Sequence, residues 1–169
     1  GSLCILIGEI AVSTESYKMA EIRVGMIMGS KSDEQVMQKG AAVLDELGIG
    51  YEVVVSSAHR NPERTANWTS TAKDRGIQVI IAGAGLAAAL PGVVAAHTII
   101  PVIGVPIASG ALSGVDSLYS IVQMPPGVPV ATVGIDNTRN AAMLAAQIIA
   151  LSDGEVARAI EVYREKWNQ

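Results

Sequence analysis

The segment Ser56 to Pro62, read SSAHRNP, carries the side chains best suited to chemistry. It places a hydroxyl, an imidazole and a guanidinium within four positions. Arg60 is suited to bidentate binding of a phosphate group, and His59 can accept or donate a proton at neutral pH. The alternative for His59 is an ordinary hydrogen-bonded histidine. The chain has one other histidine, His97, and its place within or at the end of a predicted helix favours a structural role.

A second polar segment, GSKSD at residues 29–33, follows the first predicted strand. Gly29 permits a tight turn, and the hydroxyls of Ser30 and Ser32 can donate to an anion. The amides at the start of the next helix carry the positive end of its dipole. We therefore predict a phosphate cradle, with helix capping as the alternative role of Asp33. The segment lacks the GxxxxGK[ST] pattern of a P-loop.

A third loop, GAGLAAALPG at residues 83–92, contains small residues that let the backbone approach a ligand closely. It also fits G-x-G-x-x-A loosely, but the acidic residue of a dinucleotide site is missing, because the next strand ends in Val105 and Pro106. A turn built for tight packing is the alternative. The loop at residues 109–117 resembles a lid or an intersubunit loop, with Ser113 as a possible helix N-cap.

The positions of these loops depend on the secondary structure around them. Apolar runs alternate with amphipathic stretches along the chain, and this pattern predicts a series of βαβ units. We predict an α/β fold, an open, doubly wound, flavodoxin-like parallel sheet of about five strands in the order 2-1-3-4-5. In such sheets ligands bind beyond the carboxyl ends of the strands. The predicted strands are 22–28, 52–56, 79–82, 102–105 (cut off by Pro106) and 129–135. The first predicted helix directly follows GSKSD. The other predicted helices cover residues 62–76, 90–96, 113–122, 140–151 and 155–167, and Asp153 is the predicted cap of the last one.

Bulk composition narrows the possible partners. The 169 residues are 50% hydrophobic and 17% charged, so we expect one core and apolar contacts between subunits of a homo-oligomer. A net charge of −4 argues against binding nucleic acid. The single Cys4 excludes an internal disulfide and no Cys/His pair is present to hold a structural metal, which fits a reducing cytoplasm.

Residues 1–18 form an expected N-terminal extension or added arm. Their apolar run is too short to cross a bilayer, which needs about 20 such residues, and it makes a poor signal peptide. We expect the arm to dock as an edge strand or against a neighbouring subunit, and residues 19–169 to form a single catalytic domain with C-terminal helices.

Taken in order, GSKSD, SAHR-x-P, IAGAG…LPG, PVIGVP, ALSGVDSLYSIVQMP and NAA-x-LAAQI closely resemble the bacterial-type N5-carboxyaminoimidazole ribonucleotide mutases. The resemblance covers roughly residues 22–165. It implies a three-layer αβα sandwich, a cytoplasmic homo-octamer, and no metal or organic cofactor. It also implies a purine-biosynthesis reaction that moves a carboxylate from the exocyclic nitrogen of the substrate to ring carbon C4.

The resemblance also assigns roles to residues. His59 would act as acid and base, Asp33 would bind the ribose hydroxyls, and the phosphate would be held by Ser30, Ser32, Ser57 and Arg60. The loop that flanks the base and the trapped CO2 would include Gly83, Ala84, Gly85, Ala89 and Leu90.

One departure from the family pattern lies in this loop, where Leu86 and Ala89 replace the Gly and the His of GAGGAAHLPG. Two alternatives therefore stay open. One is a direct carboxylase that joins CO2 to aminoimidazole ribonucleotide, although its animal-type members carry SAHK where this chain has Arg60. The other is a non-catalytic nucleotide-binding or dinucleotide-binding module. A response-regulator-like domain is disfavoured, because no acidic pair follows the first strand.

Overall fold

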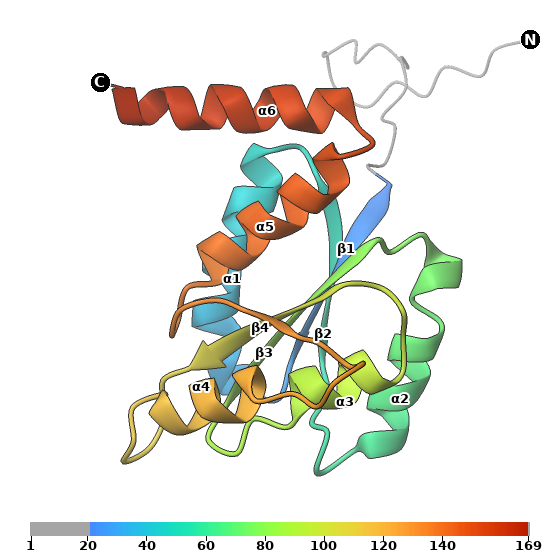
Figure 1. The fold of residues 1–169 in the computed structure, drawn as a ribbon, viewed down its shortest axis with the longest axis vertical. Helices are drawn as coiled ribbons and strands as arrows, with labels where there is room; N and C mark the ends of the chain where they lie inside the picture. The colour runs from blue at the N-terminus through green and yellow to red at the C-terminus, as the bar shows by residue number, and fades with distance from the viewer. Residues whose placement is uncertain (1–20, 169) are drawn as a thin grey trace, which may run out of the picture.

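A computed structural model describes residues 21–168 and contains a single parallel sheet of five strands (Figure 1). The strand order is β2-β1-β3-β4-β5, which confirms the predicted topology. The order reverses between β1 and β3, which is where an open α/β sheet leaves a crevice for a ligand. The strands are β1 (Ile22–Met28), β2 (Gly50–Val55), β3 (Val79–Gly85), β4 (Val102–Ile107) and β5 (Ala131–Thr132).

Helices cover both faces of the sheet and give the predicted three layers (Figure 1). One face carries α1 (Glu34–Glu46) and α5 (Thr138–Ala150), with α6 (Gly154–Glu165) packed on α5. The other face carries α2 (Pro62–Ser70), α3 (Leu90–Ala96) and α4 (Val115–Val122). Short 3-10 turns lie at Lys31–Asp33, Lys73–Arg75 and Lys166–Asn168.

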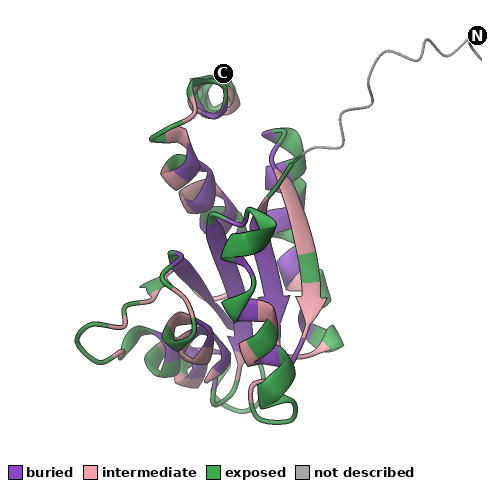
Figure 2. Ribbon diagram, turned by 90° about the vertical axis from the view of Figure 1, so that its right-hand side faces the viewer, coloured by how far each residue is buried: buried purple, intermediate pink, exposed green. Residues whose placement is uncertain are grey.

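Side chains along each central strand point alternately to the two faces of the sheet, so the hydrophobic core forms two clusters. In β3, Val79 and Ile81 face the α1/α5 layer, whereas Ile80 and Ala82 face the opposite layer. All four are fully buried, so the strand reads as a continuous apolar run, as expected for a parallel sheet covered on both sides. Figure 2 shows the buried central strands between the helices and the more exposed edge strand β2.

The prediction that Pro106 cuts off the fourth strand is wrong, because β4 continues to Ile107. The carbonyl of Gly104 accepts a hydrogen bond from the amide of Val133, and the carbonyl of Pro106 accepts one from Asp136 (2.8 Å). Both carbonyls therefore point toward β5, and the nitrogen of Pro106, which carries no hydrogen, faces the same side. The β4–β5 ladder already ends at Gly104 and Thr132, before Pro106 is reached. The proline removes no ladder bond, and β5 is only two residues long instead of the predicted seven.

Helix boundaries agree closely with the prediction except at α2 and α4. The helix predicted for residues 62–76 ends at Ser70, and a separate 3-10 turn follows at Lys73–Arg75. Ser113 does not cap this helix; Gly114 does, with a left-handed φ of 93° and no side-chain cap bond. Asp153 caps α6 as predicted, because its carboxylate accepts from the amides of Glu155 and Val156. The predicted docking of residues 1–18 lies outside the described residues. Among the residues described, no helix is long and apolar enough to cross a membrane.

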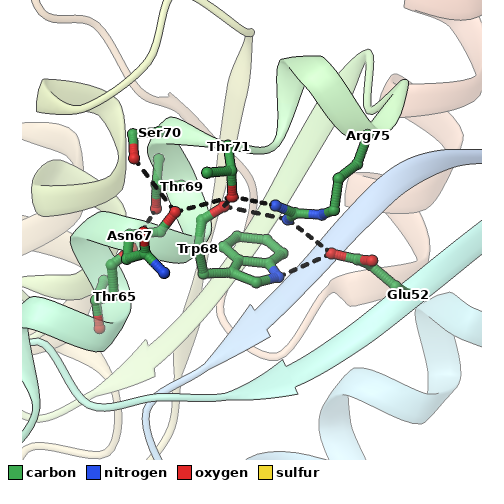
Figure 3. Close-up of polar contacts among 8 residues, drawn as sticks. All are labelled: Glu52, Thr65, Asn67, Trp68, Thr69, Ser70, Thr71 and Arg75. Carbon is green, nitrogen blue, oxygen red and sulfur yellow. Dashed lines mark hydrogen bonds and ion pairs between the residues drawn. The ribbon is translucent and has the colours of Figure 1, made fainter.

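A polar cluster fixes the C-terminal end of α2 to β2 (Figure 3). The indole N–H of Trp68 donates to the carboxylate of Glu52 (2.8 Å), and Arg75 donates to the same oxygen (2.9 Å) and to the Trp68 carbonyl (3.1 Å). The Trp68 ring lies so close to β1 that a β-carbon on Gly25 would come within 2.8 Å of it. Helix α2 is thus held at one end by packing and by hydrogen bonds to charged groups.

Candidate functional site

A cavity of about 540 Å³ lies beyond the carboxyl ends of β1, β2 and β3, where the topology predicts a ligand site. Three loops supply most of its wall, and one residue comes from the loop after β4. The lining residues are Gly29, Ser30, Ser32, Asp33, Ser57, Ala58, His59, Arg60, Ala84, Gly85, Leu86, Ala87, Ala88, Ala89, Leu90 and Ser109. Ten of the eleven residues predicted for the site therefore share one cavity, and Gly83 is the exception.

The loop between β1 and α1 folds around its own hydroxyls. The Ser30 hydroxyl accepts from the amide of Ser32 (3.3 Å) and from its hydroxyl (3.0 Å), while the Asp33 carboxylate accepts from the amide of Ser30 (3.2 Å). This reciprocal capping box belongs to the 3-10 turn before α1. Asp33 also occupies the N-cap position of α1, but its side chain makes no cap bond to that helix, so the predicted alternative role is met only in the preceding turn. Both hydroxyls still line the cavity, where a ligand can reach them.

Asp33 is buried, and its environment shifts the pKa of its carboxyl group. Burial raises the pKa of this carboxyl, and the hydrogen bonds from the Ser30 amide and the Ser32 hydroxyl offset only part of that rise. A carboxylate short of hydrogen-bond donors in a cavity suits donors brought by a ligand, such as sugar hydroxyls.

The loop between β2 and α2 presents His59 and Arg60 at the mouth of the cavity. Ser57 begins a tight turn, because its carbonyl accepts from the amide of Asn61 (2.8 Å) and its hydroxyl accepts from the amide of Arg60 (3.3 Å). The side chain of Asn61 then caps α2, and Pro62 occupies the first turn of that helix. Beneath the turn, the buried hydroxyls of Ser56 and Thr65 lie 2.8 Å apart.

The two polar loops meet through Arg60. Its guanidinium donates to the carbonyl of Gly29 (3.2 Å), 31 positions earlier in the chain. His59 and Arg60 are both exposed, and no hydrogen bond holds the His59 ring within the described part of the chain. The site therefore combines an exposed imidazole with a guanidinium, three serine hydroxyls and helix N-terminal amides, which are donors suited to an anion.

The loop between β3 and α3 forms an apolar wall of small residues. Ala84 and Leu90 are buried and Ala89 is half-buried. Leu86 differs from its neighbours, because it has a left-handed φ of 56° and is 52% exposed. Gly83 lies behind the wall: its carbonyl accepts from the amide of Gly29 (3.3 Å), and a β-carbon there would come within 2.5 Å of the Met37 sulfur.

Ser109 was not singled out from the sequence, although its loop was noted as a possible lid. The amide of Ala108 donates to the carboxylate of Asp136 (2.9 Å), which holds the start of this loop in place. Because β4 lies beside β3 in the sheet, the strand order alone indicates that residues after β4 reach the site. His97, in contrast, caps the end of α3, where its ring bonds to the Val93 carbonyl (2.8 Å), away from the cavity.

Metal ligands are not clustered in the described residues, where no three His, Cys, Asp or Glu side chains come together.

Comparison with known proteins agrees with this geometry. The family model for AIR carboxylase matches residues 23–169. The chain belongs to the AIR carboxylase family. Similar proteins named N5-carboxyaminoimidazole ribonucleotide mutase come from Pyrococcus abyssi (58% identity, covering 88% of this chain and 85% of that protein) and Thermotoga maritima (56%, covering 85% and 84%).

Two other similar proteins extend the comparison. A protein from Schizosaccharomyces pombe named phosphoribosylaminoimidazole carboxylase is 52% identical over 86% of this chain, which corresponds to 26% of that longer protein. The crystal structure of Treponema denticola PurE superposes with a TM-score of 0.79 at 34% identity, covering 86% of this chain and 91% of that one. The predicted family and fold are thus confirmed.

Proposed function

We propose that this protein is an N5-carboxyaminoimidazole ribonucleotide mutase of purine biosynthesis, in which residues 19–169 act as a single catalytic domain. The reaction converts the N5-carboxylated substrate into 4-carboxy-5-aminoimidazole ribonucleotide. One observation carries the proposal: Arg60 reaches the carbonyl of Gly29, so that two loops far apart in sequence form one anion-binding wall beside an exposed imidazole. The names of the similar proteins from P. abyssi and T. maritima support the same reaction.

The substrate is a ribonucleotide monophosphate, and its parts match the chemistry of the cavity wall. Ser30, Ser32, Ser57 and Arg60 would hold the phosphate, because hydroxyl, amide and guanidinium donors suit its oxygens. Asp33 would accept from the ribose hydroxyls. The aminoimidazole would lie against the backbone and small side chains of residues 84–90, including Ala84, Gly85, Ala89 and Leu90, with Gly83 behind them.

His59 would move the protons. As the bond between the exocyclic nitrogen and the carboxyl carbon breaks, His59 donates a proton to the nitrogen, and CO2 is released in the cavity. Ring carbon C4 then attacks the CO2, and His59 takes up the C4 proton as the new carbon–carbon bond forms. One imidazole serves both steps because it ends with the proton it gave up, and no metal or organic cofactor takes part.

A direct carboxylase is the second candidate, and the carboxylase name of the S. pombe relative favours it. Supplying each substrate separately distinguishes the two reactions. A mutase forms product rapidly from N5-carboxyaminoimidazole ribonucleotide and slowly from aminoimidazole ribonucleotide with bicarbonate, whereas a carboxylase shows the reverse preference. A protein that binds both nucleotides and converts neither would be a binding module, and the mutase assignment would fail.

We further propose that the protein is a cytoplasmic homo-oligomer, an octamer by its family resemblance. The outer face of α4 supports this, because it exposes Val115, Tyr119 and Val122 at helical spacing, and Leu112 is exposed just before the helix. Light scattering during gel filtration should give a mass near eight chains. Replacing Tyr119 and Val122 with glutamate should lower that mass, and a monomeric wild type would refute the assembly.

A further inference from the structure

Leu86 is the residue of the cavity wall whose conformation needs an explanation. It is one of three residues other than glycine with positive φ in the described chain, and a leucine pays for that conformation because its β-carbon crowds the backbone. Such strained positions cluster at functional sites, where the surroundings hold them in place.

The side chain of Leu86 lies across the gap between two loops. It extends from the β3–α3 loop toward Gly110 in the loop after β4, so closely that a β-carbon on Gly110 would come within 2.8 Å of its Cδ2 atom. The loops also approach at a second point, because a β-carbon on Gly85 would lie 3.2 Å from that of Ser109. Leu86 therefore forms an apolar seam where the walls of the cavity meet.

The loop on the other side of this seam is held firmly at its start. The carboxylate of Asp136 accepts from the amide of Ala108, and the amide of Asp136 donates to the Pro106 carbonyl. Asp136 itself has a φ of 57°, a second strained residue that serves the same loop. Leu86 thus closes against a fixed partner.

The proposed reaction requires such a seam. Released CO2 is small, uncharged and without a hydrogen-bond donor, so polar groups give it little hold and only a closed apolar wall retains it. His59 and Arg60 line the same cavity from the β2–α2 loop and are exposed. Of the residues found to line the cavity, Leu86 is the large apolar side chain that remains half exposed, whereas Leu90 is 2% exposed.

We propose that Leu86 is a specificity-determining residue that closes the cavity wall between the β3–α3 loop and the loop after β4, and so retains CO2 until C4 attacks it. This proposal rests on the proposed mutase function. When the carbon–nitrogen bond breaks, its electron pair stays on the nitrogen, which takes a proton from His59. CO2 then either bonds to C4, whose proton returns to His59, or escapes and leaves aminoimidazole ribonucleotide behind. Leu86 sets the ratio of these two outcomes.

The test follows the carboxyl carbon. Substrate labelled with ¹³C in its carboxylate is converted in buffer containing unlabelled bicarbonate and carbonic anhydrase, and mass spectrometry measures the label in the product and the aminoimidazole ribonucleotide released. Enzyme-free samples correct for spontaneous loss of CO2. We expect wild type to keep most of the label, Leu86→Gly to lose it several-fold more often, and Leu86→Met to restore retention. Leu151→Ala, which alters an exposed leucine away from the cavity, should match wild type.

The controls separate the possible failures. Glycine adopts a φ of 56° without strain, so Leu86→Gly should keep the melting temperature of wild type or raise it. If Leu86→Gly keeps the same fraction of label in the product as wild type and releases the same amount of aminoimidazole ribonucleotide, the role of Leu86 is overturned and the mutase function stays intact. If wild type forms no product from the labelled substrate, the proposed function itself has failed.

Discussion

The two ends of α2 serve opposite purposes. At its C-terminal end, Trp68, Glu52 and Arg75 bind one another and the strands beneath them (Figure 3). At its N-terminal end, the turn before the helix leaves His59 and Arg60 exposed at the cavity. The contrast teaches how a short helix of nine residues can follow a turn that leaves polar side chains exposed: the contacts at its far end stabilise it instead.

The largest test of this contrast removes the imidazole. His59→Asn should fold and assemble as wild type does, while kcat falls by about 10²- to 10⁴-fold, because acid–base catalysis is lost. Steady-state kinetics and circular dichroism measure the two effects. His97→Asn is the matched control, since His97 bonds to the backbone of its own helix, and its kcat should stay near wild type. Normal turnover by His59→Asn would rule out the assigned role.

The opposite end should show the reverse behaviour. Trp68→Ala removes a large, partly buried ring and should lower the free energy of unfolding by about 2–4 kcal/mol, while the folded fraction keeps its kcat. Trp68→Phe keeps most of the packing and loses the bond to Glu52, at a cost of about 1 kcal/mol. Urea titration measures both. Equal stability of wild type and Trp68→Ala would show that this end is no anchor.

Replacing Arg60 should have an effect of intermediate size. Arg60→Ala should raise KM by roughly tenfold or more, because a hydrogen bond from a charged donor contributes about 1.5–3 kcal/mol, and should change kcat less. Arg64→Ala, in the first turn of the same helix but outside the cavity lining, is the control and should leave KM unchanged. An unchanged KM for Arg60→Ala would contradict its role in phosphate binding.

The smallest effect concerns Asp33 on the neighbouring loop. Because burial raises the pKa of Asp33 above its ordinary value of 3.8, ionisation of this group costs stability, and the cost appears as pH rises from 3.8 through the raised pKa. Asp33→Asn should therefore raise the melting temperature of the ligand-free protein at neutral pH by about 1–2 °C. The gain should vanish below pH 3.8, where wild type is protonated in both states. A lower melting temperature at neutral pH would mean that the capping bond to Ser30 outweighs burial.

The sequence was sufficient for the frame and for most of the cavity, for physical reasons. A largely apolar run such as Ile22–Met28 indicates a strand that is covered on both faces of a parallel sheet. The polar loops that follow such strands lie together at the carboxyl ends of the strands. What it missed depended on contacts made in three dimensions. The direction of the absent N–H of Pro106, the close packing that puts Gly83 behind the wall and the approach of Ser109 are all set by neighbouring strands.

Pro106 also shapes how the sheet ends. β5 pairs with only two residues of β4, and the chain that follows β5 covers that side of the buried strand, because the amides of Val133 and Asp136 donate to carbonyls of β4. A proline on that side offers no donor, and its carbonyl is already occupied by Asp136. Pro106 therefore adds no free backbone donor or acceptor at this edge, where an unpaired strand would be open to pairing with another chain.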